Sequence, residues 1–160
     1  MDILPEETPL FRKIEGIVRE EAERYGFGEI RIPTFENTEL FVRGVGDTTD
    51  VVQKEMYTFT DRDENRSISL RPEGTAGTVR ALVEHNLVPQ GGAPAKLWYA
   101  GSMFRAERPQ KGRFREFYQA DIDIIGDGKL DILNEAEIPS IIYNIFNRFG
   151  LKRFQIRVNN

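Results

Sequence analysis

The most informative segment for the fold is the stretch from Lys96 to Ile125, which reads KLWYAGSMF RAERPQKGR FREFYQADIDII. Residues 96–104 are rich in aromatic and apolar side chains and predict a strand, and residues 114–125 predict a second one. The polar stretch 105–113 between them predicts a long hairpin arm, with Pro109 and Gly112 shaping its tip. Strands joined in this way pair antiparallel, so the sequence indicates an antiparallel sheet in the middle of the fold.

The flanking segments add helices and a second hairpin. Thr8 is a candidate cap for a first helix. Apolar residues then recur every three or four positions up to Tyr25, and Gly26 and Gly28 end the predicted helix. Hairpins in the middle of the chain favour an α+β fold, with a mainly antiparallel β-sheet flanked by helices, over a doubly wound parallel sheet. The remaining predicted elements are strand 29–33, helix 38–42, a hairpin of 56–59 with 67–70, helix 73–86, helix 134–149 and strand 153–158.

Composition narrows the class of protein. The 160 residues fit one domain of ordinary globular composition, with 39% hydrophobic and 30% charged residues. The lack of cysteine excludes disulfides, thiolate metal sites and cysteine nucleophiles, and it fits a reducing compartment such as the cytoplasm. No apolar run is long enough to span a membrane, and the first residues lack the pattern of a signal peptide.

The hairpin arm concentrates positive charge in a chain whose formal net charge is −4. Five cations and one anion lie between Arg105 and Arg115. Arginine binds phosphate oxygens through paired hydrogen bonds, so the arm suits a polyphosphate or a nucleic-acid backbone, and Phe117 on the returning strand could stack on a base. On charge alone, a solvated hairpin tip is an equal alternative.

Two further segments carry polar side chains that could bind a substrate. Glu73 and Thr75 in the segment Arg71–Gly77 could receive an ammonium group, although a helix start commonly uses such residues as caps. Alternation places Gln119, Asp121 and Asp123 on one face of a strand. That face is either a pocket floor or the wet side of a half-exposed strand.

Three stretches together resemble the front half of the class II aminoacyl-tRNA synthetase catalytic core, in its histidyl-tRNA synthetase form. The first helix and the strand ending at Pro33 are similar to the first motif of the family, which makes the dimer interface. Residues 51–59 leading to 70–77 resemble the segment that binds the amino acid. Residues 104–119 resemble the second motif in its bacterial histidyl form.

The resemblance implies ATP as a substrate and assigns four residues to it. Arg105 would hold the α-phosphate and act as the catalytic residue that stabilises the charge developing there. Glu107 would sit near the adenine, Phe117 would stack on it, and Arg113 would hold the terminal phosphates. Mg²⁺ would accompany ATP, and no residue of this chain is assigned to the metal.

The resemblance also implies histidine and tRNA(His) as partners. Glu73, Thr75 and Gln119 would receive the α-ammonium group of histidine, and Asp123 would face its imidazole. The two residues expected where the arm meets the acceptor end of the tRNA are Gln110 and Arg115.

The expected function is therefore that of a histidine–tRNA ligase, in a cytoplasmic homodimer with no membrane contact. Residues 1–160 would form a partial catalytic domain with the first two motifs. The third motif and the anticodon-binding domain would lie beyond Asn160, and we expect a trimmed fragment of this kind to be weakly active or inactive. The alternatives are the regulatory subunit of ATP phosphoribosyltransferase, a non-catalytic paralogue with the same core, another class II ligase, and a structural domain with a basic hairpin.

Overall fold

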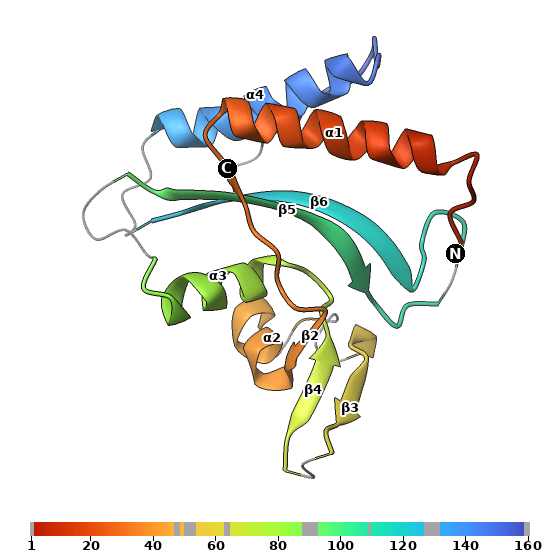
Figure 1. The fold of residues 1–160 in the computed structure, drawn as a ribbon, viewed down its shortest axis with the longest axis vertical. Coiled ribbons are helices and arrows are strands. Elements are labelled where there is room, and N and C mark those ends of the chain that lie inside the picture. The colour runs from red at the N-terminus through yellow and green to blue at the C-terminus, as the bar shows by residue number, and fades with distance from the viewer. Residues whose placement is uncertain are drawn as a thin grey trace. The chain divides into compact units, whose positions relative to one another are not determined.

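The computed structural model describes residues 2–46, 49, 54–62, 65–87, 93–108, 110–126 and 132–158. Figure 1 shows a mixed arrangement of helices and short sheets, which confirms the predicted α+β class. None of the helices in the described ranges is long and apolar enough to cross a membrane. The helices are α1 (Thr8–Arg24), α2 (Thr38–Val45), α3 (Thr75–Glu84) and α4 (Ile132–Arg148). The strands are β1 (Gly28–Glu29), β2 (Phe35–Asn37), β3 (Thr58–Thr60), β4 (Ser67–Leu70), β5 (Ala95–Phe104) and β6 (Glu116–Ile125).

The described strands form two sheets. One has the order β1-β5-β6 and the other the order β2-β4-β3. Strand β4 pairs antiparallel with both neighbours and places Ser69 opposite Thr58, so the predicted hairpin is confirmed. Strand β1 instead runs parallel to β5, with Gly28 opposite Leu97. The division into two sheets and the parallel pair are features that the sequence pattern did not indicate.

The chain divides into two compact units. The first unit contains Ile30–Leu87 and Tyr99–Asp121, and the second contains Asp2–Glu29, Val88–Trp98 and Ile122–Asn160. Strands β5 and β6 contribute residues to both. Of the residues predicted to bind substrates, all except Asp123 belong to the first unit.

In the second unit, α1 and α4 lie side by side (Figure 1). The buried face of α1 carries Val18 and Ala22, as the apolar periodicity predicts. Glu21 shares that face and is only 1% exposed. Its carboxylate accepts hydrogen bonds from Arg24 over 3.0 Å and from Arg148 over 2.9 Å. This buried charge is therefore compensated, and it ties α1 to the last turn of α4.

In the first unit, Arg71 braces the segment that leads into α3. Its Nε donates to the carbonyl of Ser102 over 2.8 Å, and its Nη1 donates to the carbonyl of Ile32 over 2.7 Å. A Cβ at Gly101 would lie 2.7 Å from Nη2, so the absence of a side chain there makes room for the guanidinium. Burial lowers the pKa of Arg71, yet an arginine stays charged at neutral pH. The brace fixes the start of the segment 71–77 against β5.

Two predicted strands differ from the structure. The strand predicted at 153–158 is wrong, because these described residues form no strand. Phe154 packs its ring against Phe146 and Tyr143 of α4 instead, with centroids 5.2 and 5.4 Å away. Of the strand predicted at 29–33, only Glu29 belongs to a strand, β1 (Gly28–Glu29), and residues 30–33 form none. Alternation alone does not make a strand where the backbone lacks a neighbour to pair with.

Two helix starts also differ from the prediction. Thr8 is the first residue of α1 rather than its cap, and its hydroxyl donates back to the carbonyl of Leu4 over 3.0 Å. Glu7 occupies the cap position. Helix α4 begins at Ile132, so Pro139 lies inside the helix and removes one backbone hydrogen bond there.

Candidate active site

The arm between β5 and β6 is closed by backbone pairing at both of its ends. Next to the strands, the N–H of Arg105 donates to the carbonyl of Arg115 over 2.9 Å. Near the tip, Gln110 and Arg113 form an antiparallel bridge. Gly112 turns the chain between them with φ of 83°, a conformation that a side chain would strain. The predicted hairpin arm therefore forms, and Gly112 shapes its tip as the sequence suggested.

An open cavity of about 280 Å³ lies along the arm. The four residues predicted to bind ATP all line it, together with Gly112 and Phe114. Those four residues are Arg105, Glu107, Arg113 and Phe117. The structure thus brings them together around one space, and that they bind ATP stays a prediction.

Arg105 is held at this cavity by one contact at an edge of its guanidinium and one at a face. Its Nε donates to the carbonyl of Pro72 over 3.0 Å, which links the arm to the segment before α3. Its guanidinium carbon lies 5.1 Å from the ring centroid of Phe117, a cation–π contact. In the described part of the chain, neither terminal nitrogen of Arg105 makes a side-chain hydrogen bond. The guanidinium is therefore positioned with two donor groups left for an anion.

Glu107 and Arg113 pair with each other across the same cavity. Their charged atoms lie 3.0 Å apart, and the Arg113 side chain is 63% exposed. An ion pair this exposed contributes about 0–1 kcal/mol, because water and salt screen it. A polyphosphate carries more negative charge than one carboxylate, so it can compete with Glu107 for this arginine.

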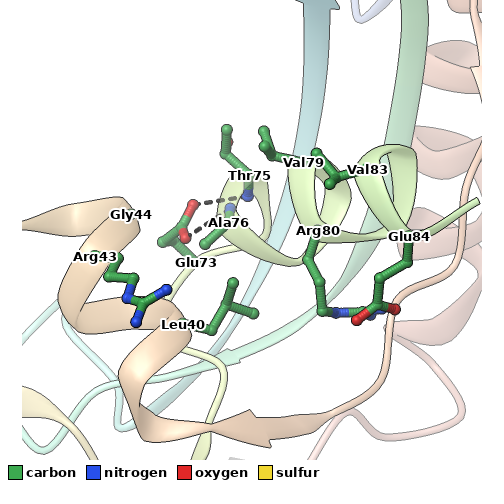
Figure 2. A pocket seen from close by; sticks show the side chains of 10 residues that line it. All are labelled: Leu40, Arg43, Gly44, Glu73, Thr75, Ala76, Val79, Arg80, Val83 and Glu84. Atoms are coloured by element: carbon green, nitrogen blue, oxygen red, sulfur yellow. Dashed lines mark hydrogen bonds and ion pairs between the residues drawn. The ribbon is translucent and has the colours of Figure 1, made fainter. Parts of the chain in front are cut away.

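Glu73 caps the first turn of α3. Its carboxylate accepts hydrogen bonds from the backbone N–H groups of Thr75 over 2.7 Å and of Ala76 over 3.0 Å, as Figure 2 shows. The capping alternative raised by the sequence is therefore real. A carboxylate has about four acceptor positions, so two remain for a substrate ammonium group.

Thr75 and Gln119 are connected through two residues that were not predicted to belong to the site. The hydroxyls of Thr75 and Tyr99 lie 3.2 Å apart, and the Tyr99 hydroxyl donates to Asp121 over 3.1 Å. The Gln119 amide donates to the same carboxylate oxygen over 2.6 Å. These bonds bring the segment 71–77 and strand β6 together on one side of β5.

The sequence signals for Tyr99 and Asp121 are weak. Tyr99 lies in the aromatic and apolar run 96–104, which predicts a strand, and the structure buries it to 3% exposure. A buried tyrosine still needs a partner for its hydroxyl, and Asp121 was already expected on the same polar face as Gln119. That face is the more buried one between residues 116 and 121. Neither Gln119 nor Asp121 lines the cavity beside the arm, so a pocket floor at this face stays a prediction.

A wider cavity of about 750 Å³ lies between α2 and α3. Figure 2 shows Thr75, Val79 and Val83 in a row along one side of α3, with Leu40 and Arg43 contributed by α2. Glu73 also lines this space. Two residues predicted to bind histidine therefore face a different cavity from the residues predicted to bind ATP.

Gln119 and the remaining predicted residues line neither cavity. Gln110 and Arg115 are exposed on the arm, as a contact with a large partner requires. Asp123 is half-buried on β6 within the second unit. Among the described residues, no cluster of three or more histidine, aspartate or glutamate side chains could hold a metal ion.

Comparison with known proteins gives a consistent result over the whole chain. The family model described as histidyl-tRNA synthetase matches residues 1–160. The histidine–tRNA ligase of Geobacillus thermodenitrificans is 50% identical over 159 residues, which are 99% of this chain and 37% of that protein. The chain thus spans little more than a third of the length of the curated relatives it matches.

Two solved structures extend this similarity to the fold. Apo histidyl-tRNA synthetase from Staphylococcus aureus matches with a TM-score of 0.77 and 39% identity, over 95% of this chain and 34% of that one. A structure from Bacillus halodurans, described as an ATP phosphoribosyltransferase regulatory subunit/histidyl-tRNA synthetase, has the same TM-score at 25% identity. It covers 95% of this chain and 37% of that one.

Proposed function

Because this chain belongs to the histidyl-tRNA synthetase family, we propose that it supplies part of the catalytic core of a histidine–tRNA ligase. The complete protein would activate histidine with ATP and transfer it to the acceptor end of tRNA(His). It would work in the cytoplasm, where translation takes place, and as a homodimer. Residues 1–160 would carry the first two motifs of the catalytic domain.

One observation carries this proposal. The four side chains that the family resemblance assigns to ATP all line a single cavity along the arm. The cavity combines two arginines with Phe117, whose ring can stack on a base. The link from Arg105 to the carbonyl of Pro72 brings this cavity next to the segment that begins with Glu73. A nucleotide and an amino acid could therefore meet at Arg105.

The chemistry that we propose needs positioning and charge neutralisation more than a nucleophilic side chain. A carboxylate oxygen of histidine attacks the α-phosphorus of ATP, and the bond to the bridging oxygen breaks to release pyrophosphate. Negative charge grows on the α-phosphate oxygens, where the positioned guanidinium of Arg105 would stabilise it. Arg113 would hold the leaving phosphates. Mg²⁺ would arrive with ATP and neutralise part of the phosphate charge, and we assign none of the described residues to it.

The amino acid would be held by its ammonium group. Glu73, Thr75 and Gln119 offer oxygen acceptors, and the first two line the cavity beside α3. Asp123 would face the imidazole. In the second step, Gln110 and Arg115 on the exposed arm would contact the acceptor end of the tRNA.

The second candidate is the regulatory subunit of ATP phosphoribosyltransferase. The Bacillus halodurans structure favours it, since that protein is described as such a subunit together with a histidyl-tRNA synthetase. A non-catalytic paralogue does not need the residues that clamp ATP. Their presence here, with Arg105 and Phe117 in contact, favours the ligase.

Histidine-dependent exchange of pyrophosphate into ATP tests the proposal in the full-length protein in which these residues occur. We expect exchange with histidine and none with proline, threonine or glycine, followed by charging of tRNA(His). No exchange, together with co-purification of a phosphoribosyltransferase, would establish the second candidate instead.

A further inference from the structure

Four side chains of the first unit form a row of hydrogen bonds. It runs from Thr75 through Tyr99 and Asp121 to Gln119, with donor–acceptor distances of 3.2, 3.1 and 2.6 Å. The ring of Tyr99 lies so close to the start of α3 that a Cβ at Gly74 would be 2.2 Å from it. The row is therefore packed in place as well as hydrogen-bonded.

The chemistry of the groups fixes the direction of every bond in this row. A carboxylate only accepts hydrogen bonds, so the amide nitrogen of Gln119, not its oxygen, must face Asp121. The single hydroxyl proton of Tyr99 goes to the same carboxylate. Tyr99 can then only accept in its contact with Thr75, so the Thr75 hydroxyl is the donor there.

We propose that Asp121 sets the polarity of this row so that both of its ends present lone pairs to the α-ammonium group of the amino-acid substrate. The ends are Oγ1 of Thr75 and Oε1 of Gln119. This inference rests on the proposed function, in which these two residues receive that ammonium group. Asp121 and Tyr99 act through them and are positioning residues.

The polarity matters because an ammonium group has three donors and no acceptor. A threonine hydroxyl or a glutamine amide can turn either way, and the wrong orientation would point a donor at the substrate. Glu73 does not have this problem, since its carboxylate accepts in any orientation. The neutral residues need an acceptor-only group that fixes their orientation. Asp121 is that group for Gln119 directly, and for Thr75 through the Tyr99 hydroxyl, whose only proton it accepts.

The variant Asp121→Asn tests the role of the carboxylate with almost no change in shape. Asparagine can donate as well as accept, so it no longer fixes the direction of the row. In pyrophosphate exchange by the full-length protein, we expect the KM for histidine to rise about 10- to 100-fold, while the KM for ATP stays within about twofold. Tyr99→Phe cuts only the branch to Thr75, and we expect a rise of about 3- to 10-fold.

A substrate analogue separates this role from general support of the fold. Imidazolepropionate is histidine without its α-ammonium group, and its inhibition constant should be the same for Asp121→Asn and the unsubstituted protein. Matched controls are Asp61→Asn near the tip of the β3–β4 hairpin and Tyr143→Phe on the exposed side of α4, and neither should change the KM for histidine. Melting temperatures check that each variant folds, and Tyr99→Phe carries the test if Asp121→Asn does not.

The outcomes distinguish this inference from the proposed function. A selective rise in the KM for histidine, with unchanged inhibition by the analogue, supports the row as an orienting device. An unchanged KM for histidine, or an equal loss of affinity for histidine and the analogue, refutes it while the ligase proposal stands. If the unsubstituted protein shows no exchange, the ligase proposal is refuted. The inference about the row then fails with it, because histidine is no longer the substrate.

Discussion

Replacing Arg105 by lysine is expected to lower kcat for histidine-dependent pyrophosphate exchange about 100-fold. Lysine keeps the positive charge but has no Nε to donate to Pro72 and no planar head to lie over Phe117. The positive charge of the side chain is then no longer held beside the α-phosphate, where negative charge develops during the reaction. Losing one such oriented donor costs about 10²- to 10³-fold in rate in other enzymes.

The same contacts give the expected change in stability. One hydrogen bond to a carbonyl contributes about 0.5–1.5 kcal/mol, and an exposed cation–π contact about 0.5–1 kcal/mol. Their loss should lower the melting temperature by about 2–8 °C, so the variant remains folded at assay temperature. The KM for histidine should change little, because Arg105 is assigned to the nucleotide.

The assay is pyrophosphate exchange with saturating histidine and varied ATP, made on the full-length protein. Arg108→Lys is the matched control, since Arg108 is an exposed arginine of the same arm to which we assign no role. A loss of less than threefold in Arg105→Lys, or an equal loss in both variants, would refute the assignment of Arg105.

Three further predictions concern packing, pH dependence and the arm. Gly74→Ala should destabilise the fold by about 1–3 kcal/mol in thermal denaturation because its Cβ would clash with a buried ring, whereas Gly16→Ala in α1, with open space around it, should stabilise by up to about 1 kcal/mol. The hydrogen bond and the charge of Arg148 lower the pKa of Glu20. The pair of Glu20 and Arg148 therefore stabilises the fold at neutral pH, and this stabilisation is lost as the pH falls through the lowered pKa. Glu20→Gln should therefore reduce the melting temperature more at pH 7 than at pH 3, and equal reductions would contradict this. Arg115→Ala should raise the KM for tRNA about 3- to 10-fold and leave pyrophosphate exchange unchanged, and a loss of exchange would remove its assignment to tRNA.

The arm and its surroundings could be predicted because their signals are local. A polar, arginine-rich stretch between two apolar strands, with Gly112 at the turn, leaves few alternatives to a hairpin. The four residues that the family resemblance assigns to ATP then fall around one cavity because the arm fixes their spacing. The helix predicted at 73–86 forms as α3, Thr75–Glu84, two residues shorter at each end.

Other features could not be predicted because they depend on partners far along the chain. Glu21 on the buried face of α1 is paired not only with nearby Arg24 but also with Arg148 at the end of α4. The hydroxyl of Tyr99 joins the candidate site only because Asp121 faces it from the neighbouring strand. Residues 153–158 alternate like a strand, but tertiary contacts of Phe154 decide their conformation.

A crystal structure of the full-length protein with a non-hydrolysable ATP analogue and histidine tests the central claim most directly. We predict the adenine on the ring of Phe117, the α-phosphate within hydrogen-bonding distance of Arg105, and the histidine ammonium group on Thr75 and Gln119. A nucleotide bound away from the Arg105–Phe117 cavity, or a histidine that touches neither Thr75 nor Gln119, would contradict the account.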